Sequence, residues 1–189
     1  MTGAPPLIGV GEAAVDFMLV TGRMPATQAG ALMYTQQPKF TPSEIDDIVA
    51  YVSTLGKGGP PIPDVDIGEG DIARGFELFI ENCAACHGTV GQGDAVTQTD
   101  IAPDLHSVEP TQIGEAVRFG PGPMPRFDEN AISPADLNSL VKWVYSTRDA
   151  FDPGGNSLGY GGPVSEGFVA FFFSLGLMLI VIRLAARRG

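Results

Sequence analysis

The stretch Asn82-Cys83-Ala84-Ala85-Cys86-His87-Gly88 decides how this chain is organised. It contains both cysteines of the 189-residue sequence, in the pattern C-x-x-C-H. Two thiols on one helical turn can each bond a vinyl group of the same porphyrin, and the histidine that follows then lies under the iron. The stretch therefore predicts one covalently attached haem c, bound by Cys83 and Cys86, with His87 as an iron ligand.

The cysteine pair has two other readings. C-x-x-C alone also occurs in thiol–disulfide switches and as half of a zinc site. A zinc site needs two further ligands, and the only histidine besides His87 is His106. A thioredoxin-like site would follow a strand, whereas the pattern before Cys83 is helical. The sequence therefore favours haem over both alternatives.

A helix is predicted on each side of the motif. Asp71 can cap the first helix, which ends near Asn82 and has an apolar stripe of Ile72, Phe76, Phe79 and Ile80. Ser133 can cap the second, over residues 134–147, with an apolar face of Leu137, Leu140, Val141 and Val144. Gly75 leaves room for a second helix, so we expect the two to cross. The predicted fold class is all-α, with a class I cytochrome c domain over residues 71–150.

The sixth iron ligand is expected from a second loop. Met124 lies in Gly-Pro-Gly-Pro-Met-Pro, a stiff loop where a methionine has no core to fill. His106 is the competitor, and bis-histidine ligation would give a lower potential than histidine–methionine ligation. We favour Met124 as the ligand and expect His106 at the surface. Pro103 and Leu105 are predicted to form an apolar wall against the haem face.

The chain ends in a predicted transmembrane helix, residues 167–186. Residues 167–182 carry no charge, and Arg183 can extend its guanidinium outward so that the span reaches about 20 residues. The alternative is a buried core helix, but three consecutive phenylalanines leave no polar face. Arginines follow the span and Glu166 precedes it, which predicts a cytoplasmic C-terminus and residues 1–165 on the outer side of the plasma membrane.

Two parts of the chain resemble each other in the same order. Thr41-Pro42-Ser43-Glu44 repeats the helix start at Ser133, and Gly22-Arg23-Met24-Pro25 repeats the loop that ends in Met124. An ordered set of such matches indicates a duplicated domain. We therefore expect residues 1–56 to be a partial first cytochrome c domain that lacks its haem-attachment motif, and interpret this as an N-terminal truncation. Whether Met24 has a ligand role is open.

Pro and Gly concentrate in two further segments, residues 57–70 and 151–166, which are predicted linkers. The formal net charge of -11 makes nucleic acid an unsuitable partner. It suits docking to a basic patch on another protein, although solubility alone is an equally good reason for it.

With these motifs, the sequence resembles the dihaem cytochrome c subunit of the actinobacterial-type menaquinol–cytochrome c reductase, the cytochrome bcc complex. The resemblance rests on the duplicated domain, on N-C-A-A-C-H-G at residues 82–88, on A-P-D-L at residues 102–105 and on P-M-P-R-F at residues 123–127. Its most specific element is P-G-G-N-S-L-G-Y-G-G-P-V-S-E-G, residues 153–167, directly before the apolar span.

The resemblance implies an electron-transfer subunit rather than an enzyme in its own right. In that family the subunit takes electrons from the Rieske iron–sulfur protein and passes them to cytochrome c oxidase, in a complex that also contains cytochrome b. The family has two haems, so a second haem c is expected in the full-length protein. The alternative is another membrane-anchored cytochrome c, linked to an oxidase or a dehydrogenase.

Overall fold

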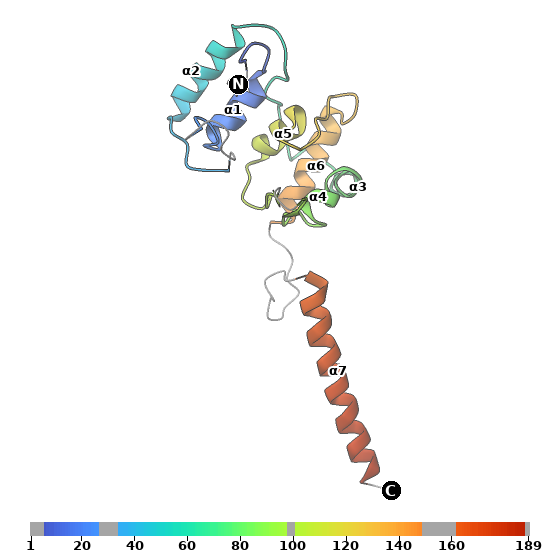
Figure 1. Ribbon diagram of the computed structural model, residues 1–189. Coiled ribbons are helices and arrows are strands. Elements are labelled where there is room, and N and C mark those ends of the chain that lie inside the picture. The colour runs from blue at the N-terminus through green and yellow to red at the C-terminus, as the bar shows by residue number, and fades with distance from the viewer. Residues whose placement is uncertain (1–5, 27–33, 98–100, 149–161, 188–189) are drawn as a thin grey trace. The chain divides into compact units, whose positions relative to one another are not determined.

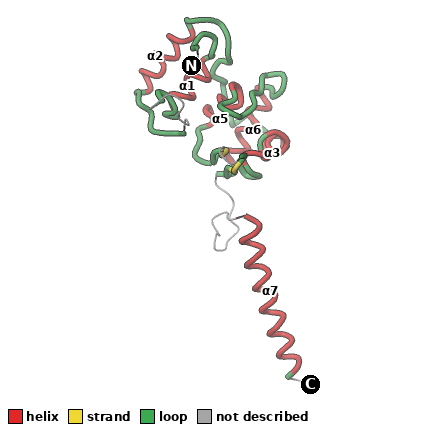
Figure 2. Tube along the Cα trace, in the orientation of Figure 1, coloured by secondary structure: helices red, strands yellow, loops and turns green. Residues whose placement is uncertain are grey.

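The computed structural model describes residues 6–26, 34–97, 101–148 and 162–187, and for residues 162–166 the backbone alone (Figure 1). Residues 1–150 form one compact unit and residues 151–189 a second. The described chain is mostly helical, and loops connect its short helices (Figure 2). Its elements are α1 (Glu12–Val20), α2 (Pro42–Ser53), α3 (Ile72–Asn82), α4 (Ala84–His87), β1 (Asp94–Ala95), β2 (Ile101–Ala102), α5 (Pro110–Phe119), α6 (Pro134–Ser146) and α7 (Gly162–Ala186).

The predicted crossing of the helices before and after the motif is confirmed. The Asp71 carboxylate caps α3 by accepting from the Arg74 N–H at 2.7 Å, and the Ser133 hydroxyl caps α6 by accepting from the Asp136 N–H at 3.1 Å. A Cβ at Gly75 would collide with the Ser139 carbonyl on α6, so the absence of a side chain lets the two backbones meet.

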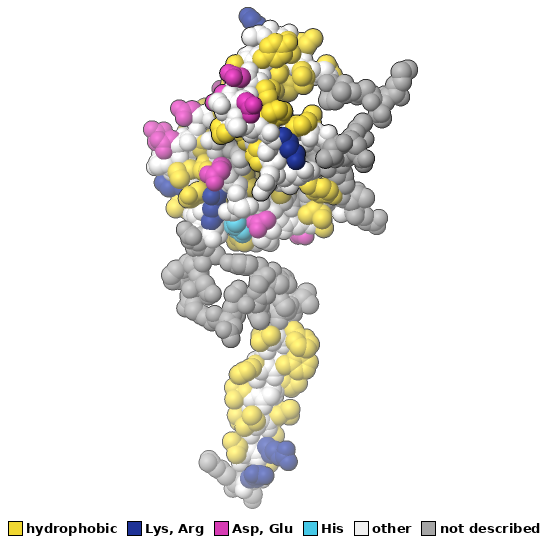
Figure 3. Space-filling model, turned by 90° about the vertical axis from the view of Figure 1, so that its left-hand side faces the viewer, with side chains coloured by type: hydrophobic (Ala, Val, Ile, Leu, Met, Phe, Trp, Pro, Cys, Tyr) yellow, Lys and Arg dark blue, Asp and Glu magenta, His cyan; other side chains and the backbone are white. Residues whose placement is uncertain are grey.

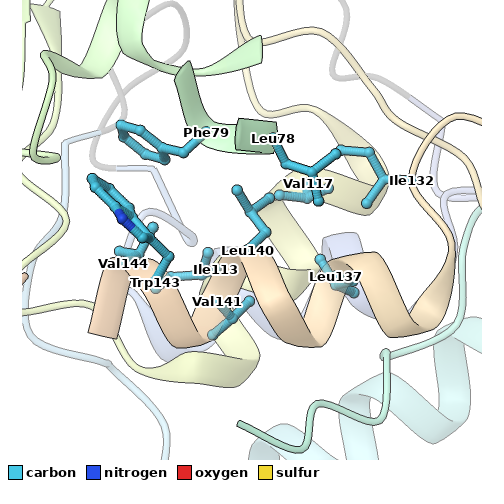
Figure 4. Packing of buried hydrophobic residues seen from close by; sticks show 10 residues of the cluster. All are labelled: Leu78, Phe79, Ile113, Val117, Ile132, Leu137, Leu140, Val141, Trp143 and Val144. Atoms are coloured by element: carbon cyan, nitrogen blue, oxygen red, sulfur yellow. The ribbon is translucent and has the colours of Figure 1, made fainter. Parts of the chain in front are cut away.

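The core of this unit forms where α3, α5 and α6 meet (Figure 4). All four predicted apolar residues of α6 are at most 1% exposed. The Phe79 ring of α3 stacks on the Trp143 indole with a centroid distance of 4.6 Å, and Val117 of α5 packs into the same cluster. Phe79 alone buries enough apolar surface to stabilise the crossing by about 2 kcal/mol.

The predicted apolar stripe of α3 is only partly correct. Phe79 is buried, whereas Ile72, Phe76 and Ile80 are 41–49% exposed. Gly75 and Leu78 complete the buried face instead. A residue spacing of four drifts around a helix by about 40° at each step, so the exposed residues run along the margin of the buried face rather than within it.

The predicted linker over residues 57–70 is packed rather than free. Val65 and Ile67 lie against the main core, the Asp66 N–H donates to the Asn138 Oδ1 at 3.1 Å, and the Lys142 ammonium donates to the Gly70 carbonyl at 2.7 Å. The segment therefore forms part of the unit's structure. Sequence reasoning missed this because proline and glycine are as common in packed irregular chain as in linkers.

Helices α1 and α2 form a smaller cluster. Leu19, Ile45 and Val49 are its buried members, and Thr41 caps α2 through the predicted capping box with Glu44. Helix α1 also packs against α5, where the Phe17 and Phe119 rings meet edge to face at 5.2 Å. Residues before the segment 57–70 thus pack, through α1, on a helix that follows the C-x-x-C-H motif within the same unit.

Two features depart from the predicted all-α fold and its boundaries. Strands β1 and β2 pair antiparallel, Asp94 with Ala102 and Ala95 with Ile101. Residues 162–166, predicted as linker, form the first turns of α7. The rest of the linker predicted over residues 151–166 lies outside the described residues.

Helix α7 contains a segment, Gly167–Ala186, of 20 residues that is long and apolar enough to cross a membrane. It presents apolar side chains along its surface, including Phe173 at 80% exposure, and Arg183 lies in its last turn (Figure 3). An exposed apolar surface of this kind is costly in water. By length and composition this segment is therefore a candidate membrane span.

Candidate functional site

The C-x-x-C-H motif forms a helical turn of its own. Helix α3 stops at Asn82, and α4 begins after Cys83, whose carbonyl accepts from the Cys86 and His87 N–H groups at 3.1 and 2.9 Å. Gly88 ends the turn with φ 74°, a conformation that disfavours side chains. The motif thus presents both thiols and the imidazole from one tight turn.

The His87 side chain is buried and its orientation is fixed. Its Nδ1 lies 3.1 Å from the Pro103 carbonyl oxygen, to which it donates as N–H. Burial lowers the pKa of His87, and the bond to Pro103 opposes this. The ring is therefore held as a neutral imidazole whose Nε2 is left to ligate a metal.

Pro103 has a role that the sequence did not predict. It was expected as apolar wall, but it contacts His87 through its backbone oxygen. A general rule could have indicated this, because a buried ligating histidine needs an acceptor for its other ring N–H. Leu105, the second predicted wall residue, is half-buried against the main core, and its N–H donates to the Gly91 carbonyl at 2.8 Å.

Both cysteines are free and partly buried. Burial and the neighbouring Cys86 raise the pKa of the Cys83 thiol to about 11. A reactive thiol or a zinc thiolate needs the opposite shift, since the thiolate is the nucleophile and the metal ligand. Moreover, the described residues contain no group of three or more His, Cys, Asp or Glu side chains that could hold a metal ion. The thiol-switch and zinc readings thus receive no support.

Met124 lies in a loop that returns to α5. Gly120 ends α5 in the left-handed conformation, the Met124 N–H donates to the Pro121 carbonyl at 3.1 Å, and the Phe127 N–H donates to the Val117 carbonyl at 2.9 Å. The expectation that Met124 has no core to fill is wrong, because its side chain packs against the same core cluster as Cys83 and Leu105. That contact restrains the side chain of Met124.

His106 has both ring nitrogens engaged by protein groups. Its Nδ1 lies 2.8 Å from the Asp104 carboxylate and its Nε2 lies 3.0 Å from the Val90 carbonyl oxygen. Ligation by His106 would require breaking one of these contacts. In this structure the His106 ring therefore connects the loop around Val90, after the motif, to the segment around Asp104.

The chemistry of these side chains fits a c-type haem. Two free thiols on one turn would supply the two attachment points, and a neutral imidazole with one nitrogen already bonded would supply an iron ligand. The Met124 thioether is a further donor that such an iron could take, and it packs on the same core as Cys83. A metal bound by the cysteines themselves would require ionised thiols, which the shift at Cys83 opposes.

Comparison with known protein families identifies the class of the domain that contains the motif. Residues 70–144 match the family described as cytochrome C oxidase, cbb3-type, subunit III. That range covers the helix before the motif, the motif, the Met124 loop and most of α6. The chain therefore contains a cytochrome c domain.

The particular family follows from whole-chain relatives. The cytochrome bc1 complex cytochrome c subunit of Corynebacterium diphtheriae is 31% identical over 193 residues, covering 94% of this chain and 68% of that protein. The subunits of the same name from Corynebacterium efficiens and Mycobacterium tuberculosis are 35% and 39% identical, over 94% and 90% of this chain. The chain belongs to the family of cytochrome bc1 complex cytochrome c subunits. It spans 64% of the length of each of the latter two relatives.

Proposed function

We propose that the chain is the electron-transfer subunit of a quinol–cytochrome c reductase and passes single electrons through one covalent haem c. The observation that carries this proposal is the C-x-x-C-H turn, with the His87 Nδ1 bonded to the Pro103 carbonyl. The relatives are named as subunits of a cytochrome bc1 complex, so the chain would act as part of an oxidoreductase rather than alone.

In this proposal each residue of the site has one task. Cys83 and Cys86 would hold the haem covalently, and His87 would bind its iron through Nε2. Met124 would supply the other protein ligand from its loop, and Leu105 would exclude water. The haem, once bound, supplies one-electron chemistry. The residues around it act by ligation, orientation and exclusion of water, and methionine as ligand raises the potential.

The relatives' name supports a place in a complex with other respiratory subunits. Within it we propose the Rieske iron–sulfur subunit as electron donor, cytochrome b as neighbour and cytochrome c oxidase as acceptor. We place the protein in the plasma membrane through residues 167–186, with its haem domain outside. The candidate span and the arginine in its last turn support this arrangement.

Residues 1–56 are proposed to be part of a first cytochrome c domain. Helix α2 has the capping arrangement and the inner apolar face of α6, and it packs on α1. The outer faces of the two helices differ. Tyr51 of α2 corresponds in position to Trp143 of α6. The Tyr51 side chain is 65% exposed, whereas Trp143 is covered by α3 and is 8% exposed. An equivalent of α3 with its own C-x-x-C-H would cover Tyr51, and a longer family member would then hold a second haem.

The ligands are tested by one double and one single substitution in the full chain, produced with haem-c attachment machinery. Cys83→Ser with Cys86→Ser should abolish covalent haem on a denaturing gel. Met124→Leu should keep the covalent haem but lower its reduction potential and change its visible spectrum. Met24→Leu is the matched control, since it lies in the similar Arg-Met-Pro loop, and should leave both unchanged. An unaltered spectrum in the Met124 variant would exclude Met124 as ligand.

A second candidate function is a subunit of a cbb3-type oxidase, favoured by the family that residues 70–144 match. Affinity purification of the tagged chain from its native membrane separates the two. Co-purification of cytochrome b and a Rieske protein supports the proposed reductase. Recovery of an oxidase catalytic subunit without them would favour the second candidate.

A further inference from the structure

Glu115 is a buried carboxyl group that the proposed electron transfer does not use. It lies on α5, in the unit that carries the haem motif, and it is completely buried. Helix α1 packs against α5, where the Phe17 and Phe119 rings are in contact, and Ala13 and Ala14 of α1 are buried. Asp16 of α1 places a second carboxyl beside Glu115.

Nothing in the described chain offsets a negative charge at Glu115. Neither carboxyl oxygen of Glu115 has a well-formed hydrogen bond among the described residues, and the Asp16 carboxyl is the acidic group that lies beside it. The cations of the surrounding elements are engaged elsewhere. Arg118 donates to the Ile132 carbonyl at 2.7 Å, Lys142 of α6 donates to the Gly70 carbonyl, and the Arg23 guanidinium lies over the Phe17 ring at 4.7 Å.

The other acidic groups near this interface have cationic partners of their own. Asp136 of α6 forms an ion pair with Arg74 at 2.8 Å, and the negative charges of Asp128 and Glu129 favour the charged form of Arg118. Asp16 is therefore the acid that faces Glu115. Burial first, and Asp16 second, raise the pKa of Glu115 from its ordinary 4.5 to about 9. At neutral pH the buried side chain is an uncharged acid.

We infer that Glu115 and Asp16 form a pH-sensitive latch, in which protonated Glu115 allows α1 to dock on α5 and its ionisation releases α1. The proton passes from the Glu115 carboxyl to solvent, and a carboxylate remains opposite Asp16. A buried, unpaired charge beside a like charge is unfavourable, and the structure relieves it by exposing the group. The packing of α1 on α5 thereby depends on pH.

The direction of the pH effect follows from linkage. Docked Glu115 binds its proton more tightly than exposed Glu115, because its pKa is raised. Docking is therefore fully favourable below the ordinary pKa of 4.5 and weakens as pH rises toward about 9. Each pH unit inside this window increases the fraction of opened α1 by up to about tenfold.

Hydrogen exchange of the α1 backbone amides tests the latch. We compare the full-length chain in detergent between pH 6 and pH 8, after correction for the intrinsic exchange rates. Protection of residues 12–20 should fall by up to about a hundredfold in the native chain and stay constant in Glu115→Gln, whose amide is uncharged at both pH values. Glu69→Gln removes an exposed acid outside the interface and is the matched control, expected to behave as the native chain.

Three results would overturn the latch. One is a protection of α1 that does not change with pH in the native chain. Another is an equal pH dependence in Glu115→Gln. The third is loss of α1 protection at every pH in that variant, because the neutral amide should dock as the protonated acid does. Asp16→Asn gives a second check, since removal of the facing carboxyl should make the pH dependence shallower.

Discussion

Helices α6 and α2 have similar N-terminal caps but different packing environments. Ser133 caps α6 and Thr41 caps α2, each ahead of a proline, and each helix buries one apolar face. On α6 the neighbouring face is also covered, by α3 at the Gly75 crossing. On α2 the corresponding face, with Asp47 and Tyr51, is exposed.

The comparison separates what local sequence determines from what a partner helix determines. Caps and apolar spacing form both helices, because those signals act within one or two turns. A complete core also requires the crossing helix α3, which directly precedes the C-x-x-C-H turn. The stability of the unit should therefore reside in the α3–α6 side, and substitutions at matched positions of α6 and α2 should differ in effect.

The largest difference is expected at the helix crossing. Gly75→Leu would drive a side chain into the Ser139 carbonyl, and should lower the free energy of unfolding by at least about 3 kcal/mol or prevent folding. Ala50→Leu on the exposed side of α2 should change it by less than about 0.5 kcal/mol. Urea titration in detergent, followed by fluorescence of Trp143, the single tryptophan, measures both. Similar losses of unfolding free energy in the two variants would contradict the expected difference between the α3–α6 crossing and α2.

A smaller difference is expected in the two apolar faces. Leu140→Ala should lower the free energy of unfolding by about 3 kcal/mol, since Leu140 is buried in the main core cluster. Ile48 takes the same position on α2 but is half-buried, so Ile48→Ala should cost about 1 kcal/mol. The same titration measures both changes, and an equal loss of unfolding free energy in the two variants would contradict the expected difference between α2 and α6.

Removing either N-cap should destabilise its own helix equally, but only the cap of α6 should affect the global unfolding midpoint. Ser133→Ala and Thr41→Ala each remove an N-cap acceptor, at about 1 kcal/mol of helix stability. The Ser133 variant should lower the urea midpoint read at Trp143. The Thr41 variant should increase hydrogen exchange within α2 and leave that midpoint in place. A shift of the midpoint in both would mean that the two sides unfold together.

The smallest effect concerns acid stability. Hydrogen bonding to Arg74 lowers the pKa of Asp136 below its ordinary 3.8. A lowered pKa means that the stabilisation is present above pH 3.8 and is lost as pH falls through the shifted value. Asp136→Asn should flatten the fall of the unfolding midpoint between pH 4 and pH 2. A fall as steep as that of the native chain would exclude a contribution from this pair.

The sequence predicted the local features of the fold and the motif. Helix limits at Asp71 and Ser133, the crossing at Gly75 and the inner face of α6 are confirmed. The candidate span over residues 167–186 coincides with the apolar segment of α7. These features depend on residues that are close together in the chain, which is why pattern reading succeeds for them.

Sequence reasoning missed features that depend on distant contacts. The packing of Val65 and Ile67, the exposure of Ile72 and the burial of Glu115 are set by elements far away in the chain. The Pro103 carbonyl faces His87 across sixteen residues, and no local pattern marks it. Met124 was favoured as a ligand for its stiff loop, yet its contact with the core also positions it.

The most direct test of the proposed electron carrier is the mass of the peptide that contains Cys83 and Cys86, taken from the membrane-extracted native protein. We predict an increment of one haem on that peptide, lost when both cysteines are replaced by serine. An unmodified peptide from cells that attach haem to their other c-type cytochromes would contradict it.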